Sequence, residues 1–498
     1  MDTLTNRVRT QKSIASGQHL APVISIPKEA LQRHRRRRLL RSISLLLIGC
    51  GVAACLMVSL GTRALRERKS KKPVGFHPNS TQTTRLAHQD QWYLAYLPHS
   101  GFHNQRIALE NALVLAYLLN RTLLVPPIQL SSQPLQYMEF DRLRHYFLLL
   151  QKQNLGHCSR LPVDSELPVE CLDYTTHTSL SWNTLTNLSS LSDRFSFIET
   201  TNFEPKALRD AFGITVEQTY LFKDREVYQY RFYEDPTDIQ PHVRFSSRID
   251  IPKLAQDSAG FKLVQMGTLF GTRRLRLHQS KSVLKHVRAA LVFGNPLLNQ
   301  VSSSIHQELT HQPQNQWRSG MNLSSGYVAV HLRLGDGEFA HHAVSNVNKT
   351  WRALVTGKTI GLTDVQASAL ALRPLLTMQG PGAACSGPFH SEPPATALNI
   401  PIFVATDKPR HSALQIFHRT FPCLFSLDSP NIVPHLGPLK AVANHDGTPL
   451  FKYLVSFVDA MVAALALEVH GTPNSTFSRF VEDVLWRRYH GLENISRG

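Results

Sequence analysis

Residues 96–127 constrain the fold of this chain more than any other stretch. They read YLPHSGFHNQRIALENALVLAYLLNRTLLVPP, and their first two residues end the apolar run WYLAYL at 92–97. The pattern predicts a buried strand, a polar turn, an amphipathic helix and a second buried strand that stops at two prolines. A strand, a helix and a second strand in succession are the repeating unit of a parallel α/β sheet.

The turn in this unit has the chemistry of an anion-binding site. The N-terminus of a helix presents unpaired N–H groups and positive potential, which suit a phosphate. The turn carries His99, Ser100, His103, Asn104 and Arg106. The alternative, that these side chains only cap the helix, is equally open. The GxGxxG fingerprint is absent, so the stretch does not favour a plain dehydrogenase.

Further apolar runs extend the alternation of strands and helices. Residues 327–332 (YVAVHL) and 402–406 (IFVAT) read as parallel strands, and residues 451–469 as a strong helix ended by His470 and Gly471. We therefore expect two α/β halves with a cleft between them, at 89–300 and 301–498. Residues 343–400, rich in Ala, Pro, Ser and Gly, are expected to be an insertion or a surface loop.

The positive charge of the chain is concentrated at its N-terminus. The net charge of the 498 residues is +18, and the first 72 residues hold 16 Lys and Arg against 3 Asp and Glu. The rest of the chain is therefore only weakly basic, which removes the main support for nucleic-acid binding by the folded part.

That basic excess flanks a candidate membrane span. Ser42 to Thr62 carry no charge over 21 residues, which is long enough to cross a bilayer as a helix. We predict a disordered cytosolic tail at 1–41, a transmembrane helix at 42–62 and a stem at 63–88. Because arginines and lysines flank both sides, charge alone does not set the orientation.

Sequons and cysteines favour a luminal body. Cys158 with Cys171, and Cys385 with Cys423, are candidate disulfides of an oxidising lumen, although four free thiols remain an alternative. The expectation is a single-pass type II protein of the Golgi or endoplasmic reticulum membrane. Asn-x-Ser/Thr sequons occur at Asn79, Asn120, Asn187, Asn322, Asn348, Asn474 and Asn494.

Three further motifs stand where strands give way to loops, which is where open α/β sheets bind ligands. They are HLRLGD at 331–336, VATD at 404–407 and GTPNSTF at 471–477. An arginine at a strand end, here Arg333, is a fork of donors suited to phosphate. The alternatives are an ion pair between Arg333 and Asp336, and ordinary helix caps at Asp407 and in 471–477.

Taken together, GFHNQR…LLNRTLLVPP, HLRLGD, FVATD and GTPNSTFSRF resemble the motifs of the GDP-fucose protein O-fucosyltransferase family, in the family's order. The resemblance covers residues 91 to about 490 and implies an α/β fold of GT-B type, with two Rossmann-like domains and the donor in the cleft. The anchor and the insertion point to a membrane-bound branch, such as a fungal one.

The resemblance also implies roles for the residues at motif positions. Arg333 and Asn104 are expected to be catalytic, with Arg333 neutralising the charge that grows on the leaving GDP. Asn104 would act with the backbone of residues 101–103 on the diphosphate and fucose. The expected substrate-binding residues are Gly101, Phe102, His103, Arg106, His331, Asp407, Ser475, Thr476 and Phe477.

The implied reaction is inverting transfer of L-fucose from GDP-fucose to a hydroxyl of a protein or glycan. No metal or other cofactor is expected, because the family that the chain resembles does not use an Asp-x-Asp metal site; Asp336-Gly337-Glu338, which is loosely similar to that motif, is interpreted as a pair of loop acids. The base that deprotonates the acceptor is unassigned, since Pro98–Gly101 lack the glutamate that some relatives have there. Candidates by chemistry are His99, His103, Asp336 and Glu338.

Three rival functions remain open. The chain could be a GT-B transferase for another nucleotide sugar, or an inactive relative that acts as a luminal binding module. The third is a nucleic-acid or lipid-surface binder driven by residues 1–72.

Overall fold

The computed structural model describes residues 74–75 and 91–495, apart from gaps at 151, 153, 162–165, 202–203, 240–243, 311–325, 372–384 and 386–389. The predicted cytosolic tail and transmembrane helix lie outside these residues, as does the predicted stem except for 74–75. Within the described part of the chain, no helix has the length and apolar character needed to span a membrane.

The first half of the described chain is built on a five-stranded parallel sheet in the order β6-β3-β2-β10-β7. Its faces follow from the alternation of side chains along β2, because neighbouring residues point to opposite sides. Leu94 and Tyr96 pack with the helix α2, and Tyr93 and Ala95 pack with Leu208 of α5. The strands are Tyr93–Tyr96 (β2), Thr122–Val125 (β3), Phe197–Glu199 (β6), Thr219–Phe222 (β7) and Leu263–Met266 (β10).

Smaller sheets and seven of the described helices accompany this sheet. A parallel three-stranded sheet has the order β11-β8-β9, and β4 pairs antiparallel with β5. These strands are Ile128–Ser131 (β4), His177–Leu180 (β5), Tyr230–Tyr233 (β8), Ser247–Asp250 (β9) and Leu275–Arg276 (β11). The helices are Phe102–Leu118 (α2), Phe140–Leu149 (α3), Trp182–Leu185 (α4), Pro205–Phe212 (α5), Ile251–Asp257 (α6), Lys281–Ala290 (α7) and Pro296–Thr310 (α8).

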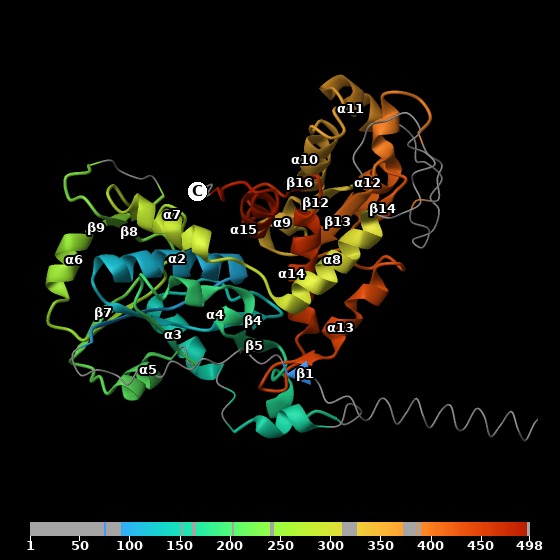
Figure 1. Ribbon diagram of the computed structural model, residues 1–498. Coiled ribbons are helices and arrows are strands. Elements are labelled where there is room, and N and C mark those ends of the chain that lie inside the picture. Colours follow the sequence, from blue (N-terminus) through green and yellow to red (C-terminus); the bar gives the residue numbers. More distant parts are fainter. Residues whose placement is uncertain are drawn as a thin grey trace, which may run out of the picture. The chain divides into compact units, whose positions relative to one another are not determined.

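The second half contains a four-stranded parallel sheet in the order β14-β13-β12-β16. Ala329 and Phe403 pack on the side of α14 and α8, whereas Val330 and Val404 pack on the side of α10 and α12 (Figure 1). Both faces are therefore covered, which explains why these strands are apolar without interruption. The strands are Val328–Leu332 (β12), Ile402–Thr406 (β13), Leu424–Phe425 (β14) and Glu468–Gly471 (β16).

The helices of this half end in one continuous C-terminal helix, residues 476–489, whose middle is π-helical. It is formed by Thr476–Arg479 (α15), Phe480–Trp486 (η8) and Arg487–Tyr489 (α16). The preceding helices are Gly337–His341 (α9), Ala343–Val355 (α10), Asp364–Ala371 (α11), Gln415–Thr420 (α12), Gly437–Lys440 (α13) and Phe451–Ala464 (α14). A short pair, Val74–Gly75 (β1) and Val442–Ala443 (β15), is parallel.

The α/β class with parallel sheets is confirmed, but three local expectations differ from the structure. Residues 343–371 hold α10 and α11 rather than a loop, because Val347, Trp351 and Leu354 form a buried helical face that the Ala- and Pro-rich composition concealed. The predicted helix at 451–469 ends at Ala464, and its last residues begin strand β16. Helix α8 crosses residue 300 and packs on α14, so the break between the halves precedes it.

Aromatic side chains join the two halves in one core. The ring of Phe102 lies 5.0 Å from that of Phe457 and 5.6 Å from that of Phe480, and Phe293 packs on both of them. The side chain of Phe102 is buried in this core, which is compatible with the predicted role of its backbone in substrate binding; that role stays a prediction.

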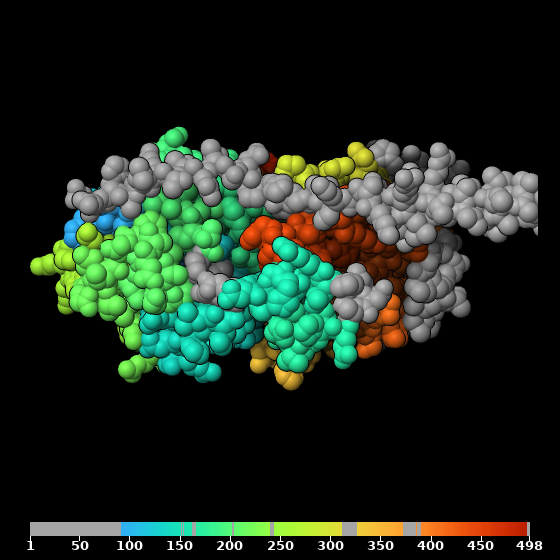
Figure 2. All heavy atoms as spheres, turned by 90° about the horizontal axis from the view of Figure 1, so that it is seen from below, coloured from blue at the N-terminus to red at the C-terminus, as the bar shows by residue number. Residues whose placement is uncertain are grey.

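Polar contacts join the halves at a second place. Lys152 donates to Asp446 over 2.6 Å, and the Tyr174 hydroxyl donates to the carbonyl of the same aspartate. Figure 2 shows the segment around residues 154–175 lying against the C-terminal part. Both predicted disulfides are confirmed, Cys158–Cys171 within this segment and Cys385–Cys423 beside β13.

Candidate functional site

The turn before α2 leaves the helix N-terminus open. Ser100 adopts a left-handed conformation with φ of 65° and donates its N–H to the carbonyl of Leu135. Gly101 is the N-cap and supplies no side-chain acceptor, and a Cβ added there would meet no atom within 4 Å. The first N–H groups of α2 therefore have no capping side chain.

Two polar atoms beside this N-terminus are buried without a partner among the described residues. They are Nδ1 of His103 and Oδ1 of Asn104. Buried polar atoms in proteins are almost always hydrogen-bonded, so unpaired ones next to an open helix end point to an absent ligand. Burial, together with the positive charges of Arg106, Arg479 and Arg288, holds the pKa of His103 well below its usual value. His103 is therefore a neutral imidazole.

A cavity of about 240 Å³ lies at this place between the two halves of the chain, and we call it the inner pocket. Helix α2 supplies one wall, and the C-terminal helix with the turn before it supplies the other. Its main polar lining residues are His103, Arg106, Glu110, Tyr228, Arg244, Thr272, Arg288, Asn474, Thr476, Arg479, Asp483 and Asn494.

Guanidinium groups give the inner pocket a positive excess. Arg106 and Arg288 both bind the carboxylate of Glu110, each at 2.9 Å, so one negative charge faces two positive ones. Arg479 and Arg244 add two further guanidinium groups, against Asp483 as the second acid. Such a pocket is suited to an anion that can accept bidentate hydrogen bonds.

Arg333 lies on the loop after β12, where it is paired with Asp336. Its Nε donates to Oδ1 of Asp336 over 2.9 Å and its Nη2 donates to Oδ2. This bidentate bond holds the pKa of Asp336 below its usual value. The predicted ion pair is thus present, and Arg333 is not among the residues that line the inner pocket. Nη1 makes no hydrogen bond among the described residues, and the guanidinium lies over the ring of Phe339.

Asp407 fixes the same loop. Its carboxylate accepts the N–H groups of Leu334 and Gly335, at 2.8 and 3.0 Å. The residue was predicted to bind the guanine or ribose, whereas here both of its oxygens hold the backbone on which Arg333 stands. Its role toward a ligand stays a prediction.

A row of rings connects the end of β12 with the inner pocket. His331 lies 5.2 Å from Phe477, Phe477 lies 5.8 Å from Phe480, and Phe480 lies 5.2 Å from His103. His331 is buried, and its Nδ1 shares a hydrogen bond of 2.7 Å with the hydroxyl of Ser478. The structure therefore brings the first, second and fourth motifs together around the C-terminal helix.

The motif at 471–477 both caps a helix and lines the inner pocket. Ser475 is fully buried and accepts the N–H of Ser478, as a helix N-cap does. Asn474, which adopts a φ of 63°, and Thr476 line the pocket instead. Of the residues predicted here, Thr476 is the one whose side chain lies at the pocket.

Several lining residues were not predicted from the sequence. Arg479 stands within GTPNSTFSRF, two residues beyond those selected, and its place one helical turn after Ser475 was the available signal. Arg288, Arg244 and Tyr228 lie outside the four motifs that were selected from the sequence. Their contribution depends on contacts with α2 that no local pattern encodes.

The candidate bases differ in how accessible they are. His99 is buried, and its ring nitrogens bind the hydroxyls of Ser100 and Thr268, while burial and then the charge of Arg274 lower its pKa to about 3. Asp336 is occupied by Arg333. Glu338 is exposed and approaches His342. None of these three has the geometry of a poised base. His103, the fourth candidate, lines the inner pocket with an unpaired Nδ1, but no acceptor hydroxyl is placed beside it, so the base stays unassigned.

One cluster of metal-ligand types occurs among the described residues, namely His157 with Cys158 and Cys171. The two cysteines form a disulfide, so their thiolates are not available as ligands.

The buried His331 predicts a pH-dependent stability. Burial and the charge of Arg333 lower its pKa from 6.5 to about 4. Between pH 6.5 and pH 4, His331 binds a proton in the unfolded chain but not in the folded chain. The free energy of unfolding therefore falls as the pH falls toward 4. Between pH 7 and pH 4 this residue accounts for a loss of about 3 kcal/mol.

The measurement is urea unfolding of the wild type and of His331→Asn at both pH values. The variant should lose about 3 kcal/mol less than the wild type over this range. His145→Asn, an exposed histidine on α3, is the control and should follow the wild type. Equal losses in all three proteins would contradict the assignment of a neutral buried His331.

With this geometry in view, comparison with known families is informative. The profile described as GDP-fucose protein O-fucosyltransferase matches residues 93–349, just over half of the chain. The chain belongs to this family. The match includes the turn before α2 and the loop after β12, and it ends before β13 and the turn at 471–477.

Individual relatives are more distant. The chain is 58% identical over 38 residues to O-fucosyltransferase 30 of Arabidopsis thaliana, which is 8% of either chain, so it spans only that small share of this curated relative. Crystal structures of POFUT1 are also similar. The complex with GDP-fucose has 11% identity and a TM-score of 0.34 over 82% of this chain and 97% of that one. A complex with GDP has 13% identity and a TM-score of 0.33, over 80% and 96%.

Proposed function

We propose that this protein is a glycosyltransferase of GT-B type that moves L-fucose from GDP-fucose to a hydroxyl of a protein or glycan acceptor. The supporting observation is the inner pocket, which is lined by four arginines and by His103 from the first turn of the uncapped helix α2. A nucleoside diphosphate is negatively charged, and its phosphate oxygens accept hydrogen bonds. Both properties match the guanidinium and N–H donors of this space.

In the proposed reaction the acceptor hydroxyl oxygen forms a bond to C1 of fucose. The bond between C1 and the β-phosphate oxygen breaks, and its electrons leave with GDP. The hydroxyl proton passes to a base that is not assigned. Attack from the face opposite the leaving group inverts C1 through an oxocarbenium-like state, so the enzyme gains most by stabilising the departing negative charge.

Different residues would contact different parts of the donor. Arg106, Arg288 and Arg479 with the first turn of α2 would hold the diphosphate, and the unpaired amide of Asn104 would orient the sugar. Arg333 does not line the inner pocket but stands on the loop after β12, from which its Nη1 would reach the leaving oxygen while Nε and Nη2 remain on Asp336. His331 and Phe477 would support this arginine from the row of rings.

The test of this function is donor binding and turnover. Titration calorimetry with GDP-fucose, GDP and UDP, followed by GDP release with candidate acceptors and with water, separates the two transferase hypotheses from each other and from the inactive relative. Preference for UDP would favour another nucleotide sugar. Binding of GDP without turnover would favour an inactive relative that serves as a binding module.

Arg479 provides a second prediction. Arg479→Ala removes a charged donor from the inner pocket, and hydrogen bonds of this kind contribute about 1.5–3 kcal/mol, so Kd for GDP should rise roughly 10- to 150-fold. Arg419→Ala, an exposed arginine on α12, is the matched control and should bind GDP like the wild type. Unchanged GDP affinity in a folded Arg479→Ala protein would place the diphosphate elsewhere.

Metal removal is the third prediction. Because arginines and a helix N-terminus supply the positive charge, we propose that no metal is required and that EDTA leaves most of the activity intact. Loss of transfer that Mn²⁺ restores would instead assign Asp336 and Glu338 to a metal site.

We also propose that residues 42–62 anchor the enzyme as a type II protein of the Golgi or endoplasmic reticulum membrane. The support is the uncharged run in the sequence and the two disulfides. Removal of residues 1–72 should release the protein from membranes and leave GDP-fucose turnover unchanged. Loss of turnover would tie the basic segment to the reaction.

A further inference from the structure

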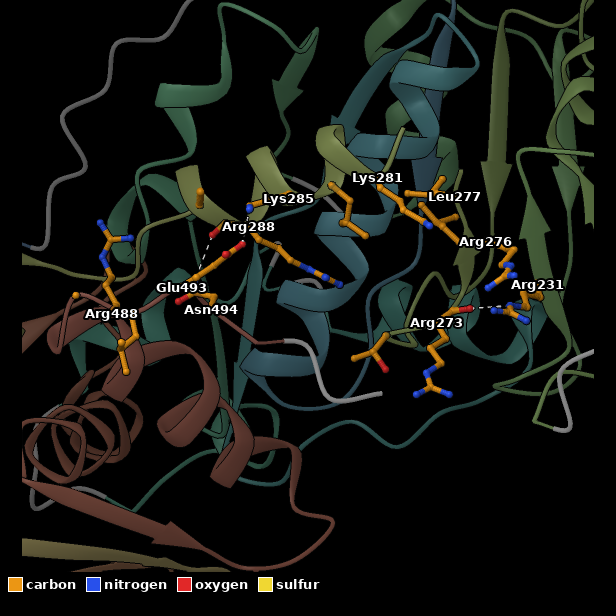
Figure 3. Close-up of a pocket in the computed structure, with 16 residues that line it drawn as sticks. Arg231, Arg273, Arg276, Leu277, Lys281, Lys285, Arg288, Arg488, Glu493 and Asn494 are labelled. Atoms are coloured by element: carbon orange, nitrogen blue, oxygen red, sulfur yellow. Dashed lines mark hydrogen bonds and ion pairs between the residues drawn. The ribbon is translucent and has the colours of Figure 1, made fainter. Parts of the chain in front are cut away.

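We propose that a basic groove beside the inner pocket holds an acidic segment of a polypeptide acceptor. The proposal rests on the proposed function for its reaction, and it adds the class of acceptor. The groove, which we call the outer groove, has a volume of about 870 Å³. Its walls are residues 272–289, which include α7, and residues 488–494 at the end of the chain (Figure 3).

The outer groove is continuous with the inner pocket. Thr272, Arg288 and Asn494 line both spaces. Arg288 binds Glu110, which itself lines the inner pocket, so this arginine stands at the junction. A peptide bound in the outer groove would therefore extend to the inner pocket, where the sugar donor is proposed to bind.

The charge of the outer groove is strongly positive. Seven arginine and lysine residues line it, together with one acid, Glu493. Three of these cations have a carboxylate partner: Lys285 pairs with Glu493, Arg276 with Asp238 and Arg288 with Glu110. Arg273, Lys281 and Arg488 are exposed and have no hydrogen bond or ion pair for their side chains among the described residues. Because they come from three separate elements, they form a fixed electropositive surface and not one solvated charge run.

The remaining lining favours a polypeptide over other polyanions. Leu275, Leu277, Leu284 and the half-exposed Leu492 give the groove apolar positions between its charges. No aromatic side chain lines it within the described residues, whereas single-stranded nucleic acids rely on stacking against aromatic rings. A segment that alternates carboxylates with aliphatic side chains matches both properties.

The test uses three short peptides of equal length with the same serine, threonine and leucine content. One carries several aspartates, one is uncharged and one carries several lysines. Binding is measured by fluorescence anisotropy, and transfer by the mass of fucosylated peptide. We expect tight, salt-sensitive binding and transfer for the acidic peptide alone, because exposed charge pairs weaken as salt screens them.

The variant protein is the triple substitution Arg273→Gln, Lys281→Gln and Arg488→Gln. Its affinity for the acidic peptide should fall about 10-fold or more, since exposed pairs contribute modestly but add up in a network. GDP-fucose affinity and the slow release of GDP with water should stay as in the wild type. Arg142→Gln, Lys253→Gln and Arg419→Gln, three exposed cations elsewhere, form the matched control and should change none of these quantities.

Each outcome decides the proposal. Equal binding of the three peptides, or full acidic-peptide affinity in the first triple variant, would overturn it. Polygalacturonate or phosphatidylserine vesicles that bind through these cations, where the acidic peptide does not, would overturn it in favour of another polyanion. Peptide binding without transfer would remove the acceptor assignment. Absence of GDP-fucose binding would instead sink the proposed function and leave the peptide measurement interpretable.

Discussion

Arg333→Ala is expected to lower kcat for fucose transfer by at least about 100-fold, the scale seen when one preorganised donor to a developing oxyanion is lost. The physical reason is the charge on GDP, which is larger in the transition state than in the bound donor. Asp336 and Asp407 hold Arg333 and its backbone in place, so its Nη1 needs little reorganisation during the reaction. The effect should appear in kcat, with the affinity for GDP much less changed.

Two further variants test how Arg333 acts. Arg333→Lys keeps the charge but loses the fork, and should recover only part of the rate. Asp336→Asn leaves Arg333 charged but weakens its positioning, and should lie between the wild type and Arg333→Ala. Near-normal transfer by a folded Arg333→Ala protein would show that Arg333 serves only in the ion pair with Asp336.

Phe480→Ala is expected to lower the free energy of unfolding by about 3–5 kcal/mol, the usual cost of a large cavity in place of a buried phenylalanine. Phe480 is fully buried and contacts Phe102, Phe293 and Phe477. It also packs on His103, so its loss should loosen the wall of the inner pocket and weaken GDP binding as well.

The matched control is Phe417→Ala. Phe417 is equally buried, but it lies in the separate core between α10, α12 and β13. Both variants should lose similar stability in urea unfolding, while GDP affinity should fall in Phe480→Ala alone. Equal GDP affinity in the two folded variants would refute the role of the row of rings in shaping the pocket.

Local patterns predicted much of the second sheet. The strand at 402–406 matches β13, and the run at 327–332 matches β12 within one residue, because strands covered on both faces must be apolar throughout. Helices α10 and α11 were missed, since their small and polar residues obscured a buried face that is evident only against β12. The first two residues of β16, Glu468 and Val469, were assigned to the preceding helix because the apolar run continues through residues 465–467 and no turn signal separates the two elements.

The candidate site also has one part that the sequence predicted and another part that only the tertiary structure revealed. The sequence alone placed His103, Asn104, Arg333 and the turn at 471–477 at ends of strands or helices, because an N–H or guanidinium group there is a local property. Only the tertiary structure decided which charges meet. Glu110 lies between Arg106 and Arg288, Arg479 reaches the same pocket, and Asp407 binds the backbone of Arg333's loop. These contacts join residues far apart in the chain, and their energies depend on burial by segments that no local pattern describes.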